Sequence, residues 1–168
     1  MKNWLLLGCI FFFVGCKTTQ KTVVLAKEDP IKKEEKTEKA SPALVLVRTD
    51  AVSLTLKNKA YSLGKRVLMT CNTSRFKPFT NEEATPKVIK NTTQERLTQV
   101  CHKFRVRYGE FKDITLEEVI HDQSDGSYIF RFKAKYERDF AKKELRVTMD
   151  KSQKVSAIKS TDWEENFL

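Results

Sequence analysis

The chain has 168 residues and a formal net charge of +10, with 32 Lys and Arg residues against 22 Asp and Glu residues. This length allows one ordinary globular domain. The composition contains 40% hydrophobic residues and no apolar run near the roughly 18 residues of a spanning helix, which excludes a fully disordered chain and a multi-span membrane protein.

The first sixteen residues have the pattern of an export signal: a Lys at position 2, an apolar stretch over residues 4–14, and then Cys16. Residues 13–16 (FVGC) resemble the lipobox of a bacterial lipoprotein signal peptide. The resemblance implies that Cys16 receives diacylglycerol and palmitate after removal of residues 1–15. A similar run that ends at Cys9 leaves too short an apolar region, so Cys16 is the predicted lipidation residue. The alternatives are a plain secretory signal and a short core helix.

Acylation would place the protein in the cell envelope. Two or three acyl chains on Cys16 hold a protein firmly in a bilayer, because each buried methylene adds about 0.8 kcal/mol. The lipid bilayer is therefore the first predicted partner. Lys17 rather than Asp follows the cysteine, and the resemblance to enteric lipoproteins then implies the outer membrane.

Residues 17–42 are predicted to be a solvated linker. They contain seven Lys, five Asp and Glu, two Pro and no aromatic residue, so they cannot bury enough apolar surface to offset the entropy of ordering. Fully extended, they reach roughly 90 Å. The predicted organisation is a signal peptide over residues 1–15, the acylated cysteine and charged linker over residues 16–42, and a single domain over residues 43–168.

An amphipathic helix is predicted after Asp50, because apolar residues recur there at spacings of three and four. Its buried stripe consists of Val52, Leu56, Ala60, Leu63, Val67 and Cys71. Its start is open, because residues 43–47 (ALVLV) could form a short strand. Thr85 and Pro86 then predict the cap and first position of a short helix that ends at Ile89.

A third helix is predicted to begin at a capping box, Thr92-x-x-Glu95, and to end at Gly109. Its apolar face consists of Leu97, Val100, Cys101, Phe104 and Tyr108.

The second half of the chain changes to the period of two that is typical of strands. In residues 128–137, an inward face (Tyr128, Phe130, Phe132, Ala134 and Tyr136) alternates with an outward face (Ile129, Arg131, Lys133, Lys135 and Glu137). Further strands are predicted over residues 145–149 and 155–158, and a weaker one over residues 111–120. Helices followed by an antiparallel meander of four strands predict an α+β fold.

This order of elements resembles the nuclear-transport-factor-2-like fold, and in particular small bacterial lipoprotein domains of unknown function. The resemblance covers roughly residues 50–163, and its runs are YGEF (108–111), FRF (130–132), LRV (145–147) and KVSAI (154–158). It implies N-terminal helices packed on a curved, cone-shaped antiparallel sheet of four strands, with a pocket between them. The candidate pocket residues are Tyr128, Phe130, Phe132 and Tyr136.

Cys71 and Cys101 lie on the apolar faces of the first and third predicted helices. They are either bridged by a disulfide, which export would allow, or two reduced core cysteines. No catalytic residue, metal site or cofactor is predicted, because no base and orienting group can be assembled around the two histidines, His102 and His121.

Arg131, Lys133, Lys135 and Arg146 are expected to project into solvent from one sheet face. Such a face either binds an anionic polymer of the envelope or prevents edge-to-edge aggregation. Nucleic acid is not an expected partner, because the aromatic residues face inward and leave no stacking platform.

The expected function is therefore that of a lipid-anchored, non-enzymatic module that binds a small ligand in its pocket or an anion on its basic face. An envelope enzyme that uses the same pocket is one alternative. A structural or assembly subunit that forms a homodimer through the sheet is the other.

Overall fold

The computed structural model describes residues 43–168, and the predicted signal peptide, Cys16 and linker lie outside this range. The described chain begins with a strand, continues through a 3-10 turn and three α-helices, and ends with four strands. These elements are β1 (Leu44–Val47), the turn Thr49–Ala51, α1 (Leu54–Thr73), α2 (Pro86–Asn91), α3 (Gln94–Tyr108), β2 (Phe111–Asp122), β3 (Ser127–Tyr136), β4 (Lys143–Met149) and β5 (Val155–Asp162). Within residues 43–168, no helix has the length and apolarity needed to cross a bilayer.

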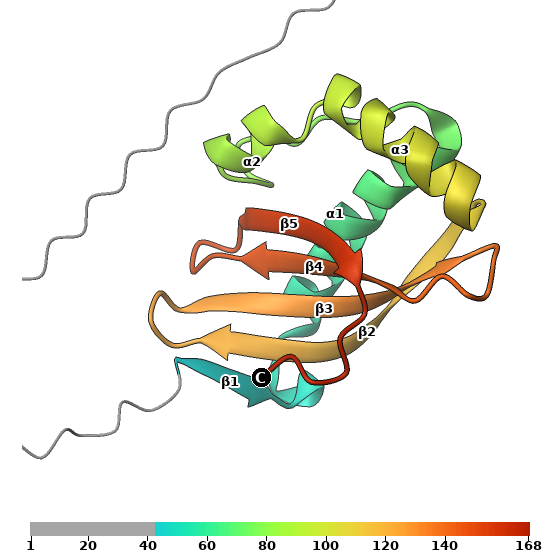
Figure 1. Cartoon of the computed structure of the whole chain (residues 1–168). Helices are drawn as coiled ribbons and strands as arrows, with labels where there is room; N and C mark the ends of the chain where they lie inside the picture. Colours follow the sequence, from blue (N-terminus) through green and yellow to red (C-terminus); the bar gives the residue numbers. More distant parts are fainter. Residues whose placement is uncertain (1–42) are drawn as a thin grey trace, which may run out of the picture. The chain divides into compact units, whose positions relative to one another are not determined.

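The five strands form one antiparallel sheet in the order β1-β2-β3-β4-β5. Figure 1 shows α1 crossing one face of this sheet, with α2 and α3 beyond the edge strand β5. The predicted α+β class is confirmed, but the expected number of four strands is wrong. The fifth strand, β1, pairs with the end of β2 and places Leu46 opposite Ile120. Four apolar residues alone do not specify a strand, so it is this pairing that makes residues 44–47 extended.

Helix α1 carries the predicted stripe and packs closely on the sheet. It begins at Leu54 because the Ser53 hydroxyl accepts a hydrogen bond from the Leu56 amide at 3.2 Å. A Cβ atom at Gly64 would lie 2.8 Å from Leu145 Cδ2 on β4. The helix therefore approaches the sheet at a distance that a side chain at this position would prevent.

Helix α3 begins one residue later than the sequence predicted. Thr93 rather than Thr92 is the N-cap, and its hydroxyl accepts a hydrogen bond from the Arg96 amide at 3.4 Å. Two neighbouring threonines offer the same cap chemistry, so tertiary packing selects between them.

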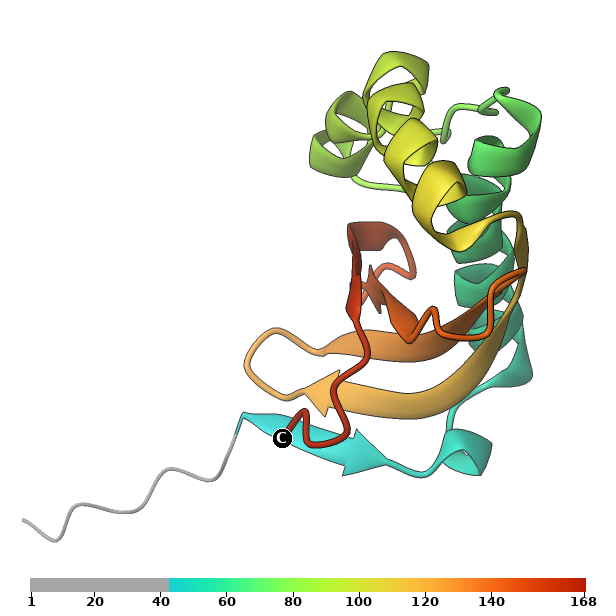
Figure 2. The ribbon, with the colours of Figure 1, turned by 45° about the vertical axis from the view of Figure 1, so that its right-hand side comes forward.

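The predicted apolar face of α3 is only partly buried. Figure 2 shows α3 crossing the end of α1 above the sheet, so most of its surface meets solvent. Val100, which was expected on the buried face, is 51% exposed. The fully buried residues of α3 are Cys101 and Tyr108, while Leu97 and Phe104 are half-buried.

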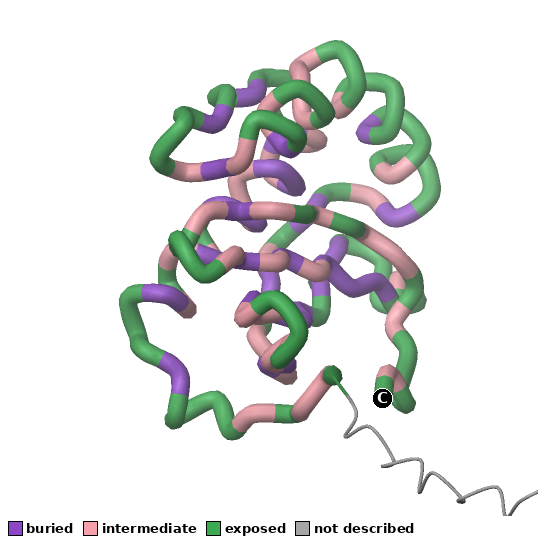
Figure 3. Tube along the Cα trace, turned by 90° about the vertical axis from the view of Figure 1, so that its left-hand side faces the viewer, coloured by how far each residue is buried: buried purple, intermediate pink, exposed green. Residues whose placement is uncertain are grey.

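The inward face of β3 is confirmed. Phe130, Phe132, Ala134 and Tyr136 are buried in the core, and Tyr128 is half-buried and stacked on His121 with ring centroids 4.6 Å apart. Figure 3 shows most of the buried residues in the interior of the domain and the exposed residues along its outer turns.

The segment between α1 and α2 is fixed to both layers by Glu83. Its carboxylate accepts hydrogen bonds from the Arg66 guanidinium on α1 at 2.7 and 2.8 Å. The neighbouring Ala84 forms a parallel bridge to Val155 on β5. The Arg66 hydrogen bonds lower the pKa of the Glu83 carboxyl from 4.5 to about 2. The charged form of Glu83 therefore stabilises the position of α2 beside β5.

We expect Glu83→Gln to lower the free energy of unfolding by about 1–2 kcal/mol at neutral pH. Because the folded-state pKa is lowered, this contribution is complete above pH 4.5 and is lost as the pH falls toward 2. Urea unfolding of both proteins across this pH range should show curves that converge in acid. The exposed Glu165→Gln serves as the control, with a change of no more than about 0.5 kcal/mol. A difference that is constant with pH would contradict the role of the charge.

Candidate functional site

The outer face of β3 and β4 carries only two of the four solvent-exposed basic residues that the sequence predicted. Arg131 lies directly across from Arg146 in the β3–β4 register. Arg131 was expected to be exposed, but it is 0% exposed. The same expectation is wrong for Arg146, whose side chain is only 14% exposed. Lys133 and Lys135 are exposed as expected.

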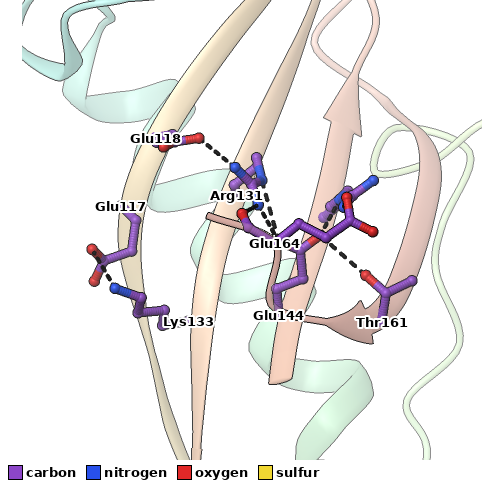
Figure 4. A network of polar contacts seen from close by, with 8 residues as sticks. Glu117, Glu118, Arg131, Lys133, Glu144, Thr161 and Glu164 are labelled. Carbon is purple, nitrogen blue, oxygen red and sulfur yellow. Dashed lines mark hydrogen bonds and ion pairs between the residues drawn. The ribbon is translucent and has the colours of Figure 1, made fainter. Parts of the chain in front are cut away.

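Arg131 is buried because carboxylates surround it (Figure 4). It donates hydrogen bonds to Glu144 at 2.6 and 3.2 Å and to Glu118 at 2.5 Å. Glu144 is also 0% exposed, and it further accepts hydrogen bonds from Arg146 and from the Thr161 hydroxyl. A buried charge pair is tolerated only when its remaining hydrogen-bonding groups are satisfied, and this network satisfies them. Its charges are therefore engaged within the protein.

The C-terminal residues cover this network. The rings of Trp163 and Phe167 lie 4.4 and 4.5 Å from the Arg131 guanidinium, and Phe167 also lies 4.1 Å from that of Arg146. The Glu164 carbonyl accepts a further hydrogen bond from Arg131 at 2.7 Å. The helix and strand patterns did not predict this cover. The two aromatic and two acidic residues of WEENFL (163–168) are the signal that could have indicated a segment packed on a basic surface.

A lysine-lined pocket remains beside this cover. It has a volume of about 410 Å³ and lies between β2, β3, the start of β4 and the C-terminal residues. Its basic lining residues are Lys133, Lys135, Lys142 and Lys143. Lys133 pairs with Glu117 at 3.3 Å and Lys143 with Asp162 at 2.9 Å, so half of these charges are already compensated.

The aromatic residues that were predicted to line a pocket fill the core instead. Phe130, Phe132 and Tyr136 are buried, and neither these nor Tyr128 line any of the pockets described for residues 43–168. Burial, and secondarily Tyr108, raises the pKa of the Tyr136 hydroxyl above its usual value. Tyr136 is therefore not placed to exchange a proton with a ligand.

The structure joins Cys71 and Cys101 by a disulfide, which resolves the alternative left open by the sequence. Their Cα atoms are 4.6 Å apart, and the bond ties α1 to α3. One side of the disulfide borders an open pocket of about 420 Å³ that His102 and Arg105 also line. The other side borders a more apolar pocket between the helices and the sheet.

This apolar pocket has a volume of about 260 Å³. Its apolar lining residues come from α1, α3, β4 and β5 and include Leu68, Leu97, Val100, Phe104, Leu145 and Ile158. A second pocket of about 220 Å³, lined by Lys87 and Ser156 among others, shares Asn91, Thr92 and Ile158 with it. We call these two connected pockets the α3–β5 groove. It is apolar at the end near the disulfide and polar at the end near α2.

The groove contains a buried hydroxyl without a partner. Within residues 43–168, Ser160 Oγ on β5 and Trp163 Nε1 are the buried side-chain polar atoms that form no hydrogen bond. Ser160 lines the groove. Because buried hydroxyl groups are almost always hydrogen-bonded, this one indicates a place for a ligand or a water molecule.

The helices that line the groove are attached to the rest of the domain at positions outside the groove or at its edge. α2 is fixed to β5 through the bridge between Ala84 and Val155, and α3 is fixed to α1 through the disulfide. The Gln94 side chain at the start of α3 adds hydrogen bonds to the Phe76 amide and the Ser74 carbonyl. These attachments leave the middle of α3 separated from β5.

Comparison with known proteins finds no matching family model, no matching curated protein and no matching solved structure. Among the described residues, no group of three or more His, Cys, Asp or Glu side chains is placed to hold a metal ion. His102 is exposed, and His121 is stacked on Tyr128.

We expect Arg131→Met to lower the free energy of unfolding by about 3–5 kcal/mol, because Glu144 would stay buried without its main partner. The double variant Arg131→Met with Glu144→Leu should recover much of this loss, because both buried charges are then removed. Urea unfolding at neutral pH measures both changes.

The matched control is Lys133→Met, which removes a surface ion pair with Glu117 and should cost no more than about 1 kcal/mol. A single Arg131 variant as stable as this control would contradict the network.

Proposed function

We propose that the protein is anchored to the cell envelope by an acylated Cys16 and that its folded domain binds a small amphiphilic molecule in the α3–β5 groove. The observation that carries the second half of this proposal is the unpartnered Ser160 hydroxyl in a wall made mainly of apolar side chains. A ligand that fills the apolar end and donates to or accepts from Ser160 would satisfy this group.

The shape and chemistry of the groove favour an amphiphile. Its apolar part, at about 260 Å³, lies just below the roughly 300–1,000 Å³ of typical small-molecule sites and suits a single short hydrocarbon chain. Its other end offers the Asn91 amide, the Thr92 hydroxyl and the Lys87 ammonium group. A molecule with one apolar tail and a polar or anionic head matches both ends.

Binding without chemical conversion is the favoured activity. Asn91, Thr92 and Ser160 can hydrogen-bond a ligand, but none of them acts as a general base without an activating partner. An envelope enzyme that uses this groove therefore remains the alternative.

We also propose that the domain has the nuclear-transport-factor-2-like fold. A long helix across a sheet, followed by consecutive antiparallel strands and a groove between helices and sheet, supports a cone of the nuclear-transport-factor-2-like type. Two bulges in β2, between Phe111 and Asp113 and between Leu116 and Glu118, would bend the sheet as a cone requires.

A second candidate function is the binding of an anionic envelope polymer at the lysine-lined pocket. The observation that favours it is the pair of exposed lysines, Lys135 and Lys142, at the edge of a pocket of about 410 Å³. It is the weaker candidate, because Arg131 and Arg146 on the same face are engaged with Glu144.

The groove can be tested with 1-anilinonaphthalene-8-sulfonate, a small fluorescent amphiphile with an apolar ring system and an anionic head, and the chain starting at residue 17. We expect Ser160→Leu to weaken binding at least about ten-fold, because the added side chain fills the apolar end and removes the hydroxyl. The control Ser62→Leu changes an exposed residue of α1 that lines none of the described pockets. Equal dissociation constants for the Ser160→Leu and Ser62→Leu variants would contradict binding in the groove.

Anchoring should depend on one thiol. We expect Cys16→Ser to abolish metabolic labelling with radioactive palmitate and to move the protein out of the membrane fraction. Cys9→Ser is the matched control and should change neither result. Continued labelling of the Cys16→Ser variant would show that the anchor is assigned to the wrong residue.

A further inference from the structure

Most of the excess positive charge of the domain lies in the helical layer of α2 and α3, and little of it lies in α1 and the sheet. Residues 74–108, which contain α2 and α3, have eight Lys and Arg residues against three Asp and Glu residues. The rest of the described chain has sixteen basic against fourteen acidic residues. One of the three acids in the helical layer, Glu83, is itself paired with Arg66 on α1. The helical layer therefore presents a positive surface.

Helix α3 concentrates this charge on its solvent side. The centre of that side consists of the exposed residues Arg96, Gln99, Val100, Lys103, Val106 and Arg107, which we call the α3 outer face; the exposed Glu95, Thr98, His102 and Arg105 flank it. Residues three and four apart lie on one side of a helix, so Arg96, Lys103 and Arg107 form a continuous basic stripe with Val100. Among residues 43–168, none of these three basic residues forms an ion pair.

Two valines are exposed within this basic surface. Val100 is 51% exposed and Val106 is 63% exposed. Basic residues interleaved with exposed apolar ones are typical of helices that lie on membrane surfaces, where the cations meet the phosphates and the apolar side chains enter the headgroup region.

We propose that the α3 outer face docks the domain on a bilayer that carries anionic phospholipid headgroups. Each Lys or Arg close to such a surface increases affinity about five-fold, so the basic stripe is worth about 100-fold. Docking by this face does not require the proposed anchor. An acyl group on Cys16 would add to it by keeping the domain near a bilayer, because 26 residues (17–42) separate Cys16 from the folded domain.

Docking has a consequence for the groove. Val100 belongs both to the α3 outer face and to the wall of the α3–β5 groove. A docked domain therefore holds the groove next to the lipid surface, where amphiphiles are found. This consequence rests on the proposed function, whereas the docking itself does not.

The test uses the full chain with vesicles of phosphatidylcholine, alone or mixed with phosphatidylglycerol. Vesicles are sedimented, and the bound protein is treated with a lysine-acetylating reagent and mapped by mass spectrometry. With phosphatidylglycerol, we expect several-fold slower acetylation of Lys87, Lys90 and Lys103, and no change at the exposed Lys135 and Lys142. The protection should disappear near 1 M salt, where the Debye length falls to about 3 Å.

The two proposals are distinguished by the vesicles. Sedimentation with phosphatidylcholine alone tests the anchor, and lysine protection that requires phosphatidylglycerol tests docking. A chain that sediments only with phosphatidylglycerol would support docking and count against the anchor. Equal acetylation on both vesicle types, or sedimentation with neither, would overturn the docking proposal.

A matched pair of variants separates the α3 outer face from net charge. One variant combines Arg96→Gln, Lys103→Gln and Arg107→Gln, and the control combines Lys135→Gln, Lys142→Gln and Lys159→Gln on the sheet side. Each removes the same charge from exposed residues. We expect only the α3 variant to lose protection of Lys87 and Lys90. Equal loss in both variants would show a general charge effect and would overturn the proposed face.

Discussion

The buried pair of Arg131 and Glu144 constrains the whole outer side of the sheet. Two charges at 0% exposure in the middle of adjacent strands require partners on every side, because an unpaired buried charge costs several kcal/mol. Glu118 on β2, Thr161 on β5 and the Glu164 carbonyl supply those partners. The network therefore joins β2, β3, β4 and β5 and determines where the C-terminal residues lie. The outer face of β3 and β4, which the sequence predicted to be basic, is therefore not strongly positive, because Arg131 and Arg146 are paired with Glu144.

The strand pattern shows what alternation can and cannot predict. The period of two correctly separated Phe130 and Phe132 from Arg131 and Lys133, because successive side chains point to opposite faces of any strand. It could not show that Trp163 and Phe167 would return to cover Arg131, because that contact joins residues more than thirty positions apart. Alternation assigns a side chain to a face. Whether the face is covered depends on the rest of the chain.

The helical period has the same limit as strand alternation: it assigns residues to one side of a helix but does not show whether that side is covered. The centre of the α1 stripe, Leu56, Ala60, Leu63 and Val67, was predicted correctly, because α1 lies across the sheet and buries this side, with Gly64 at the closest approach. Val52 is buried but precedes the helix, and Cys71 is half-buried. The stripe of α3 was predicted only in part, because α3 lies beyond β5 (Figure 1) and Val100 is 51% exposed. The α3–β5 groove arises from this offset. It could not be read from the sequence, since its walls combine Leu68, Leu97 and Ile158 from three separate segments.

The disulfide connects the groove to the charged helical surface. Cys71 and Cys101 hold α3 against α1, while the bridge of Ala84 to Val155 holds α2 against β5. In this arrangement, Ile158 borders the groove and Val100 and Val106 stay exposed on α3. The same restraint therefore leaves an apolar groove on one side of α3 and an exposed basic face on the other.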